Sequence, residues 1–323
     1  MRRVELIGCR VALTAALLAC MRPATATPFA YITNQGSHDV SVIDLGEQRV
    51  IATVPVGRSP AGVAAAGRAG RVFVSNPDSK TVSVIDMREH QVVGSFAAGD
   101  GPVGMAAAPD GTRVYVADWY GNRLLGFDTR TLRPVTALAV GRAPAGVAVH
   151  ADGATVYVAE RDDDGVAVVD VAAQRVLSRI RVGSHPFALL VDAPRQRLYA
   201  LNVKSDDVSV IDTRSLRVVA TVKVGKAPYG AALTADGRRL YITNQHDDSV
   251  SVIDAPSLQV IQTLRGFGHP EGVAAHGDRV YVVNWMDDNV SVLDATTGRT
   301  LGSIATGRNS RGFGAFIGEP NEP

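Results

Sequence analysis

The stretch YITNQGSHDVSVIDLGEQRVIATVPVG, which runs from Tyr31 to Gly57, returns in altered form along the chain of 323 residues. One such copy, YITNQHDDSVSVIDAPSLQVIQTLRGFG, begins at Tyr241. The opening aromatic residue recurs in seven copies, with five steps of 42 residues and one of 40: Tyr31, Phe73, Tyr115, Tyr157, Tyr199, Tyr241 and Tyr281. A later aspartate keeps the same phase: Asp44, Asp86, Asp128, Asp170, Asp212, Asp254 and Asp294. A glycine shortly before a proline is a third marker in six copies, and the seventh, GRNSRG, lacks the proline. These markers establish an internal repeat.

Each repeat contains four short β-like runs. In the unit around Tyr115 these are GMAAA, then RVYVAD after the turn PDGT, then RLLGFD, then RPVTALAVG. Val, Ile, Tyr and Leu dominate the runs, and turn residues bound them. No window outside the extreme N-terminus shows a sustained helical period. A step near 40 residues with four strands indicates a propeller blade.

The two ends of the chain predict how the ring closes. The chain enters at FAYITN, which is the second strand type, and ends with RGFGAFIG, which resembles the first strand type. The C-terminal strand should therefore join the N-terminal blade as its innermost strand, beside AYITN, and leave no free sheet edge. The sequence predicts an all-β fold: one seven-bladed β-propeller over residues 27–318, with four antiparallel strands per blade, and a disordered tail at 319–323.

The repeat unit, with its YITN, VSVID and Gly-x-x-Pro segments, resembles the YVTN family of β-propeller repeats. This family is found largely in exported bacterial and archaeal proteins. The resemblance covers Phe29 to about Gly318 and implies the propeller fold. It does not imply one activity, because a fold hosts many functions.

The first 26 residues have the pattern of a secretory signal peptide. Arg2 and Arg3 precede a short apolar run at 11–18, and Ala24-Thr25-Ala26 fits the small-x-small cleavage rule. We therefore expect a periplasmic or extracellular protein that begins at Thr27. The apolar run is too short for a transmembrane span. In the alternative, LLAC at 17–20 is a lipoprotein signal and Cys20 carries a lipid anchor.

Composition narrows the possible partners. Both cysteines, Cys9 and Cys20, lie in the signal segment, so the propeller should hold no disulfide and no thiolate ligand. The net charge of +1 gives no bulk attraction to nucleic acid or to an anionic membrane. Nucleic acid is thus disfavoured as a partner, and one closed ring predicts a monomer.

Polar residues that recur in every blade should serve the blade. The asparagines after the second strand and the aspartates after the third are expected to bond their own backbone two residues on and to shape turns. The asparagine series is Asn34, Asn76, Asn202, Asn244 and Asn284.

Residues that break the repeat should carry function. Many of them fall on the face that surrounds the channel mouth, where the loops between strands two and three and the connections between blades lie. Trp, Tyr and Arg concentrate in binding hot spots, and a concave mouth is the default ligand site. The predicted ligand or partner site comprises Arg58, Trp119, Tyr120, Arg142, Phe187, Lys226, Tyr229, Trp285, Arg308 and Arg311.

Histidines on the same face could bind Zn, Cu or Ni if they converge. The weak candidates are His38, His185, His246 and His269. The alternative is that they are unliganded loop histidines, and we predict no cofactor. The sequence also contains no Gly-rich phosphate loop, Gly-x-Ser-x-Gly elbow or His-Glu-x-x-His motif.

Three functions are compatible with these observations. The first is an exported, non-enzymatic binding or scaffold protein that presents its channel mouth to a protein partner or small ligand. The second is a lactonase-like hydrolase, in which His269, Glu271 and His185 hold a divalent metal or polarise a carbonyl. The third, implied by resemblance alone, is an accessory protein beside a periplasmic quinone-cofactor dehydrogenase or cytochrome.

Overall fold

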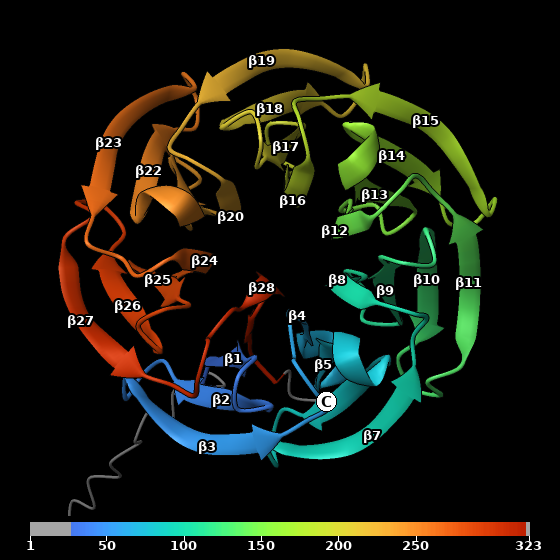
Figure 1. Cartoon of the computed structure of the whole chain (residues 1–323), viewed down its shortest axis with the longest axis horizontal. Coiled ribbons are helices and arrows are strands. Elements are labelled where there is room, and N and C mark those ends of the chain that lie inside the picture. Colours follow the sequence, from blue (N-terminus) through green and yellow to red (C-terminus); the bar gives the residue numbers. More distant parts are fainter. Residues whose placement is uncertain (1–26, 321–323) are drawn as a thin grey trace, which may run out of the picture.

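Seven blades, each of four antiparallel strands, form a closed ring around a central channel, and a short fifth strand joins one of these sheets in parallel (Figure 1). The computed structural model describes residues 27–320. The predicted all-β, seven-bladed propeller is confirmed. The predicted signal peptide, the lipid anchor at Cys20 and the last three residues of the predicted tail lie outside the described residues.

The strands follow the repeat without gaps. Blade 1 contains β1 (Phe29–Asn34), β2 (Asp39–Asp44) and β3 (Arg49–Pro55), completed by β29 (Ile317–Gly318). Blade 2 contains β4 (Gly62–Ala66), β5 (Arg71–Asn76), β6 (Thr81–Asp86) and β7 (Gln91–Ala97). Blade 3 contains β8 (Pro102–Ala107), β9 (Arg113–Asp118), β10 (Arg123–Asp128) and β11 (Pro134–Ala139). Blade 4 contains β12 (Pro144–Val149), β13 (Thr155–Glu160), β14 (Gly165–Asp170) and β15 (Arg175–Arg181).

The remaining blades repeat this order. Blade 5 contains β16 (Pro186–Asp192), β17 (Arg197–Asn202), β18 (Asp207–Asp212) and β19 (Arg217–Lys223). Blade 6 contains β20 (Pro228–Leu233), β21 (Arg239–Asn244), β22 (Ser249–Asp254) and β23 (Gln259–Arg265). Blade 7 contains β24 (Pro270–His276), β25 (Arg279–Asn284), β26 (Asn289–Asp294) and β27 (Thr300–Ala305). Single 3₁₀ turns are η1 (Gly67–Ala69), η2 (Pro77–Ser79), η3 (Arg161–Asp163) and η4 (Gln245–Asp247).

The opening aromatic of each repeat packs between blades. All seven of these rings are almost completely buried. The hydroxyl of Tyr241 in blade 6 donates to the carbonyl of Ala295 in blade 7 at 3.0 Å. Buried apolar area is the main stabilising contribution in such a core. The repeat thus forms one continuous set of inter-blade contacts.

The two polar series behave differently. The aspartates shape turns as expected: Asp44 Oδ1 accepts the backbone N–H groups of Gly46 and Glu47 at 2.8 and 2.9 Å. The prediction for the asparagines was wrong. Asn244 is fully buried, and its Nδ2 donates to the side chains of Ser249 and Ser251 across the hairpin, both at 3.0 Å. These asparagines therefore tie two strands together by side-chain bonds.

The C-terminal segment closes the ring, but not as one strand. β29 pairs antiparallel with β1 and completes blade 1, as predicted. β28 (Phe313–Ala315) instead pairs in parallel with β4 of blade 2. Ser310 pairs with Asn34 and Ile317 with Ala30, so the closing segment advances seven residues while β1 advances four. In blade 4, Pro144 pairs with Glu160 and Val147 with Val158, so the innermost strand advances three residues while its neighbour advances two. The closing segment is therefore two residues longer than its counterpart in blade 4, and β28 leaves the edge of β1.

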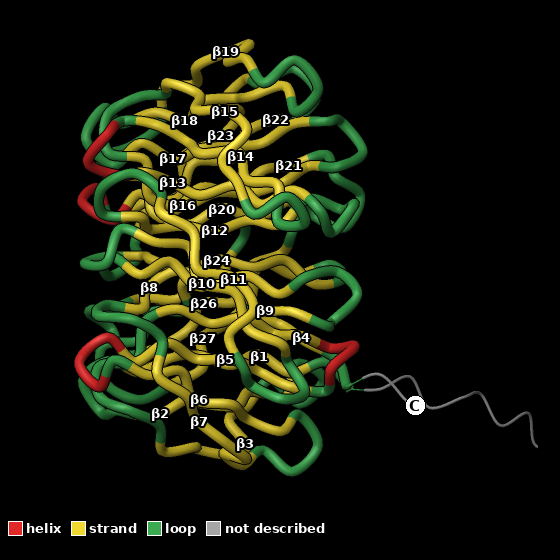
Figure 2. The backbone as a smooth tube through the Cα atoms, turned by 90° about the vertical axis from the view of Figure 1, so that its right-hand side faces the viewer, coloured by secondary structure: helices red, strands yellow, loops and turns green. Residues whose placement is uncertain are grey.

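The ring has two distinct faces (Figure 2). The mouth face carries the loops between second and third strands, including η2, η3 and η4, and the connections between blades. The hairpin face carries the other turns, including η1, and the described chain begins and ends there. No helix within residues 27–320 is long and apolar enough to cross a membrane.

Candidate functional site

Seven equivalent positions lie at the mouth end of the innermost strands, each directly after the proline of the Gly-x-x-Pro turn or its counterpart Ser310. Their occupants, in order around the ring, are Ala61, Val103, Ala145, Phe187, Tyr229, Glu271 and Arg311. Three neighbouring positions are therefore small, and the other four carry two aromatic rings and two opposite charges. We call these last four residues the mouth cluster.

The two charges of the mouth cluster form a buried ion pair. Arg311 Nε lies 2.6 Å from Glu271 Oε2, and the side chains are 19% and 2% exposed. Gln245 donates to the other carboxylate oxygen at 2.7 Å, and Arg311 Nη2 donates to the Tyr229 hydroxyl. Burial raises the pKa of Tyr229, so this hydroxyl stays protonated. Burial opposes the charge of Arg311, but Glu271 outweighs it and raises the Arg311 pKa.

The two aromatic residues of the mouth cluster belong to a larger aromatic cluster that also includes Phe313 and Trp119. The ring of Phe187 is 4.5 Å from Tyr229 and 4.8 Å from Phe313, measured between centroids. Trp119, from the loop after β9, lies 6.3 Å from Phe187, and the Arg161 guanidinium covers the Trp119 ring at 5.4 Å. The mouth is therefore lined by aromatic surface on the side of blades 3 to 6.

The second tryptophan is on the opposite side of the mouth. Trp285 occupies in blade 7 the position that Trp119 occupies in blade 3, and it is 5.9 Å from the His269 ring. The residues that follow the tryptophans, Tyr120 and Met286, are 75% and 61% exposed. Two equivalent loops thus present an aromatic residue and an exposed apolar side chain across the mouth.

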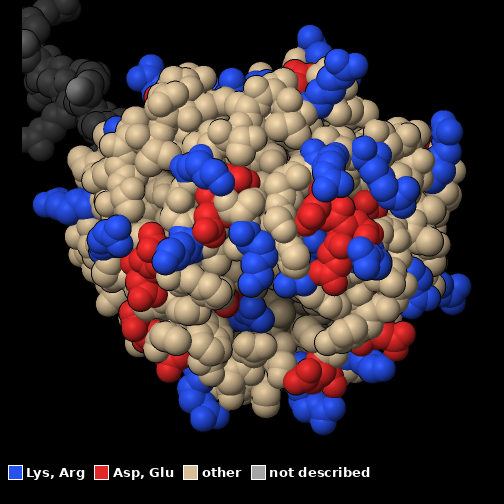
Figure 3. Space-filling view, turned by 45° about the horizontal axis from the view of Figure 1, so that its top comes forward, with Lys and Arg blue, Asp and Glu red and all other residues tan. Residues whose placement is uncertain are grey.

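The predicted basic residues of the rim do not converge. Arg58 bonds the Asp78 carbonyl, Arg142 pairs with Asp163 at 2.7 Å, and Arg308 bonds the Gly36 carbonyl. Each arginine thus serves a nearby loop, and Lys226 is exposed. Figure 3 shows basic and acidic side chains interleaved around a central hollow. This face therefore offers no single-sign patch for a polyanion.

The candidate histidines are also separated. His246 and His269 lie side by side, with ring centroids 5.4 Å apart. His185 lies beside Asp164 of η3's loop, and His38 accepts the backbone N–H of Ser59. Within residues 27–320, no three His, Cys, Asp or Glu side chains are placed to hold a metal ion. Glu271 is bonded to Arg311 and Gln245, so the structure does not bring His185, His269 and Glu271 together as a set.

Two buried carboxylates were missed. Asp118 and Glu160 replace asparagine at the end of β9 and β13, and they are 0% and 1% exposed. Arg123 pairs with Asp118 at 2.7 Å, and Arg179 with Glu160 at 3.1 Å. Burial would raise the Asp118 pKa, but Arg123 and three backbone N–H donors lower it. The interruption of the asparagine series was the signal, and the compensated charges indicate a structural role.

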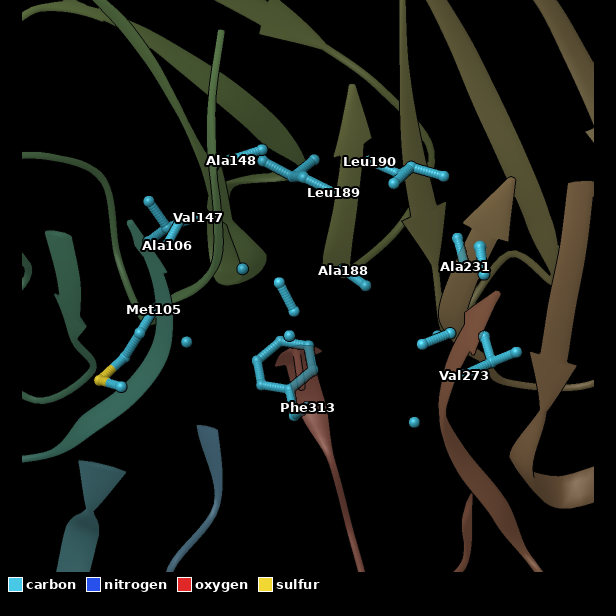
Figure 4. Close-up of a pocket in the computed structure, with 18 of the residues that line it drawn as sticks. Met105, Ala106, Val147, Ala148, Ala188, Leu189, Leu190, Ala231, Val273 and Phe313 are labelled. Atoms are coloured by element: carbon cyan, nitrogen blue, oxygen red, sulfur yellow. The ribbon is translucent and has the colours of Figure 1, made fainter. Parts of the chain in front are cut away.

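The channel below the aromatic cluster holds a cavity of about 430 Å³ (Figure 4). Its side-chain lining is apolar and includes Met105, Val147, Leu189, Val273 and Phe313. No residue of the predicted site lines it. The structure therefore separates the mouth from a second space inside the channel.

The fold and channel define the class of the chain as a seven-bladed β-propeller, and part of its sequence is similar to the lactonase propellers. The model of the family described as Lactonase, 7-bladed beta-propeller matches residues 86–215, from the end of β6 into the turn after β18. No curated protein matches the sequence significantly.

Solved structures share the propeller at low identity. Hydrazine synthase of Kuenenia stuttgartiensis is 21% identical, with a TM-score of 0.74 over 88% of this chain and 100% of that chain. A functionally unknown protein from Desulfotomaculum acetoxidans is 13% identical, with a TM-score of 0.78 over 91% and 99%. Dihydro-heme d1 dehydrogenase NirN is 16% identical, with a TM-score of 0.68 over 88% and 74%. These similarities establish the fold alone.

Proposed function

We propose that this protein is an exported, non-enzymatic binding propeller whose mouth face receives a protein partner. The observation that carries the proposal is the gathering of large, repeat-breaking side chains on one face. The mouth cluster forms the centre, and Trp119 and Trp285 flank it. Buried aromatic and arginine anchors surrounded by a polar rim are typical of binding hot spots.

The exposed apolar residues favour a protein over a small ligand. Tyr120 and Met286 stand beside the tryptophans, on opposite sides of the mouth. The other large apolar side chains that are exposed within residues 27–320 belong to the outermost strands, such as Val93 of β7 and Ile261 of β23. A partner that spans the mouth would cover both loops at once. Exposed apolar groups on loops are a usual mark of interaction surfaces.

Export fits the position of the first strand. The signal pattern ends at Ala26, and β1 begins at Phe29. Cleavage there would leave every propeller strand in the mature chain. Mass spectrometry of the protein recovered from the periplasm or medium should give a chain that starts at Thr27, and a chain that keeps residues 1–26 would contradict export by this route.

A lactonase-like hydrolase is the second candidate, because the lactonase family model matches residues 86–215. A panel of lactones and esters, with and without divalent metals, tests it. In an enzyme, His269→Ala and Glu271→Gln should abolish turnover. An accessory role beside a redox enzyme is the third candidate, favoured by the names hydrazine synthase and dihydro-heme d1 dehydrogenase among the similar structures.

Site-specific photo-crosslinking tests the proposed function in the native host. A benzoylphenylalanine at Tyr120 or Met286 should give a discrete protein adduct, whereas one at Arg238, exposed on the hairpin face, should not. The Trp119→Ala/Trp285→Ala variant should keep its melting temperature and lose the adduct, since each anchor contributes about 2 kcal/mol or more. Adducts that form at Arg238 and are absent at both mouth positions would overturn the assignment of this face.

A further inference from the structure

The channel cavity is a separate space with its own chemistry. Its volume of about 430 Å³ lies in the range of roughly 300–1,000 Å³ that is common for small-molecule sites. Its walls come from β4, β8, β12, β16, β20, β24 and β28, and Figure 4 shows Phe313 projecting into its centre. The side chains around it are apolar, and its lining contains no Asp, Glu, Lys, Arg or His.

Aromatic rings narrow the cavity toward the mouth on the side of blades 5 and 6. The Phe313 ring packs against Phe187 and Tyr229, with centroids 4.8 and 5.7 Å away. The innermost strands also approach one another closely at this level. A β-carbon at Gly104 would lie 2.0 Å from the Ala145 carbonyl oxygen, so only glycine fits. Nothing from the mouth cluster lines the cavity.

The closing segment forms the mouth end of the cavity. The pairing of β29 with β1 completes blade 1, whereas the two additional residues of the segment carry Phe313 into the channel as part of β28. Gly314, at φ +119°, allows the chain to turn there, a conformation that other residues rarely adopt. The two additional residues of the closing segment are not needed to pair β29 with β1. They place Phe313 in the lining of the cavity.

The open end faces the hairpin side. A second hollow of about 520 Å³ shares Ala65, Ala107 and Ala275 with the cavity and adds polar residues at the rim. Among these are Arg68, His276 and Glu319. A molecule can thus reach the apolar space from the hairpin face without passing the mouth.

We propose that the channel cavity is a binding site for a compact, uncharged and largely hydrocarbon molecule that enters from the hairpin face. Apolar walls favour the hydrocarbon part, and the absence of any counter-charge in the lining excludes an ion. The innermost strands β8, β12, β16, β20 and β24 each pair on one side only, so backbone N–H and C=O groups on their free edges can meet one or two hydroxyl or carbonyl groups. Sugar phosphates and nucleotides do not fit this chemistry. The site is independent of the partner proposed for the mouth.

Fluorescence titration with 1-aminoanthracene, an uncharged three-ring amine that brightens in apolar surroundings, tests the proposal. The purified protein should bind it saturably at one site. Anthracene-1-carboxylate has the same rings with a negative charge, and it should bind at least about tenfold more weakly, a difference readily resolved in a titration. Ala315→Leu adds volume at an exposed position of the lining, and it should weaken 1-aminoanthracene at least about tenfold. Ala305→Leu, at an exposed position on the outermost strand β27, is the matched control and should not.

Several outcomes would overturn the site. They are the absence of saturable binding, equal affinity for the carboxylate, and equal affinity in the Ala315→Leu and Ala305→Leu variants. Loss of binding in Trp119→Ala/Trp285→Ala would also overturn it, because the probe would then lie at the mouth. The melting temperature of each variant shows whether its fold is intact. If Ala315→Leu does not fold, a crystal structure of the wild-type protein with 1-aminoanthracene shows whether the probe lies in the channel, and a probe found elsewhere overturns the site.

Discussion

Arg311→Ala should destabilise the propeller strongly, although Arg311 sits in a segment that looks like a surface loop. The change removes three hydrogen bonds, two to Glu271 and one to Tyr229. Glu271, which is 2% exposed, then keeps its bond to Gln245 but has lost its ion pair with Arg311. The unpaired buried carboxylate is the reason for the predicted loss of stability.

The magnitude follows from burial. Removing one partner of a buried ion pair costs about 3–5 kcal/mol. Arg311 retains 19% exposure and Gln245 still bonds the carboxylate, so the lower end applies. We expect a loss of about 3 kcal/mol, which corresponds to roughly 6–12 °C in melting temperature for a domain of this size.

A double-mutant cycle with Glu271→Gln isolates the charge effect. In the Arg311→Ala background, Glu271→Gln removes the unpaired charge and should restore about 2 kcal/mol. Arg308→Ala is the matched control: this arginine is exposed, its side chain donates to the Gly36 carbonyl at 3.0 Å, and its loss should change stability by less than about 0.5 kcal/mol. Urea unfolding followed by far-UV circular dichroism measures the four proteins of the cycle and the Arg308→Ala control.

The reasoning fails if Arg311→Ala and Arg308→Ala have the same stability. It also fails if Arg311→Ala and the double variant unfold at the same urea concentration, since the buried charge would then contribute nothing.

Burial lowers the pKa of His90, although nearby carboxylates oppose this shift, so the unfolded chain binds a proton more readily than the folded chain. The free energy of unfolding should therefore be fully present above the unfolded pKa of about 6.5 and should decrease as the pH falls below that value. His90→Gln should flatten that loss between about pH 7 and 5, and equal slopes of melting temperature against pH in both proteins would contradict it. Gly104→Ala should lose about 2 kcal/mol or more by a clash with the Ala145 carbonyl, while Gly302→Ala, with open space around it, should be neutral in the same thermal assay; equal effects would refute the close approach. Deletion of residues 312–323 should cost several kcal/mol because β28 and β29 are lost, and an unchanged melting temperature would show that they do not close the ring.

The ring could be predicted from the sequence because each blade corresponds to one copy of a repeat of about 42 residues. The path of the closing segment could not be predicted, since RGFGAFIG matches the first strand type over its whole length. Only the register against β1 reveals that two residues are surplus. That register depends on a pairing between residues almost 290 positions apart, such as Phe29 and Gly318.

For the site, repeat-breaking residues located the mouth cluster but not its burial. Glu271 and Arg311 belong to different copies, and their contact arises only when the ring closes. The channel cavity escaped prediction for the opposite reason. Residues such as Ala106, Ala148 and Ala231 conform to the repeat, so a search for departures from it passes over them.

The short strand that completes blade 1 also sets how the molecule responds to force. Phe29 pairs with Gly318 and Ala30 with Ile317, and the N- and C-terminal extensions leave from the same end of this pair. Tension between the two ends would therefore load these hydrogen bonds one after another, as in unzipping, rather than all at once in shear. Once β29 has peeled away, fewer bonds hold β1 to the closing segment, such as the one from the Tyr31 N–H to the Phe316 carbonyl. Thermal unfolding must disrupt the contacts between all the blades, whereas tension on the two ends acts first on this one short pair. The ring should thus open at a low pulling force.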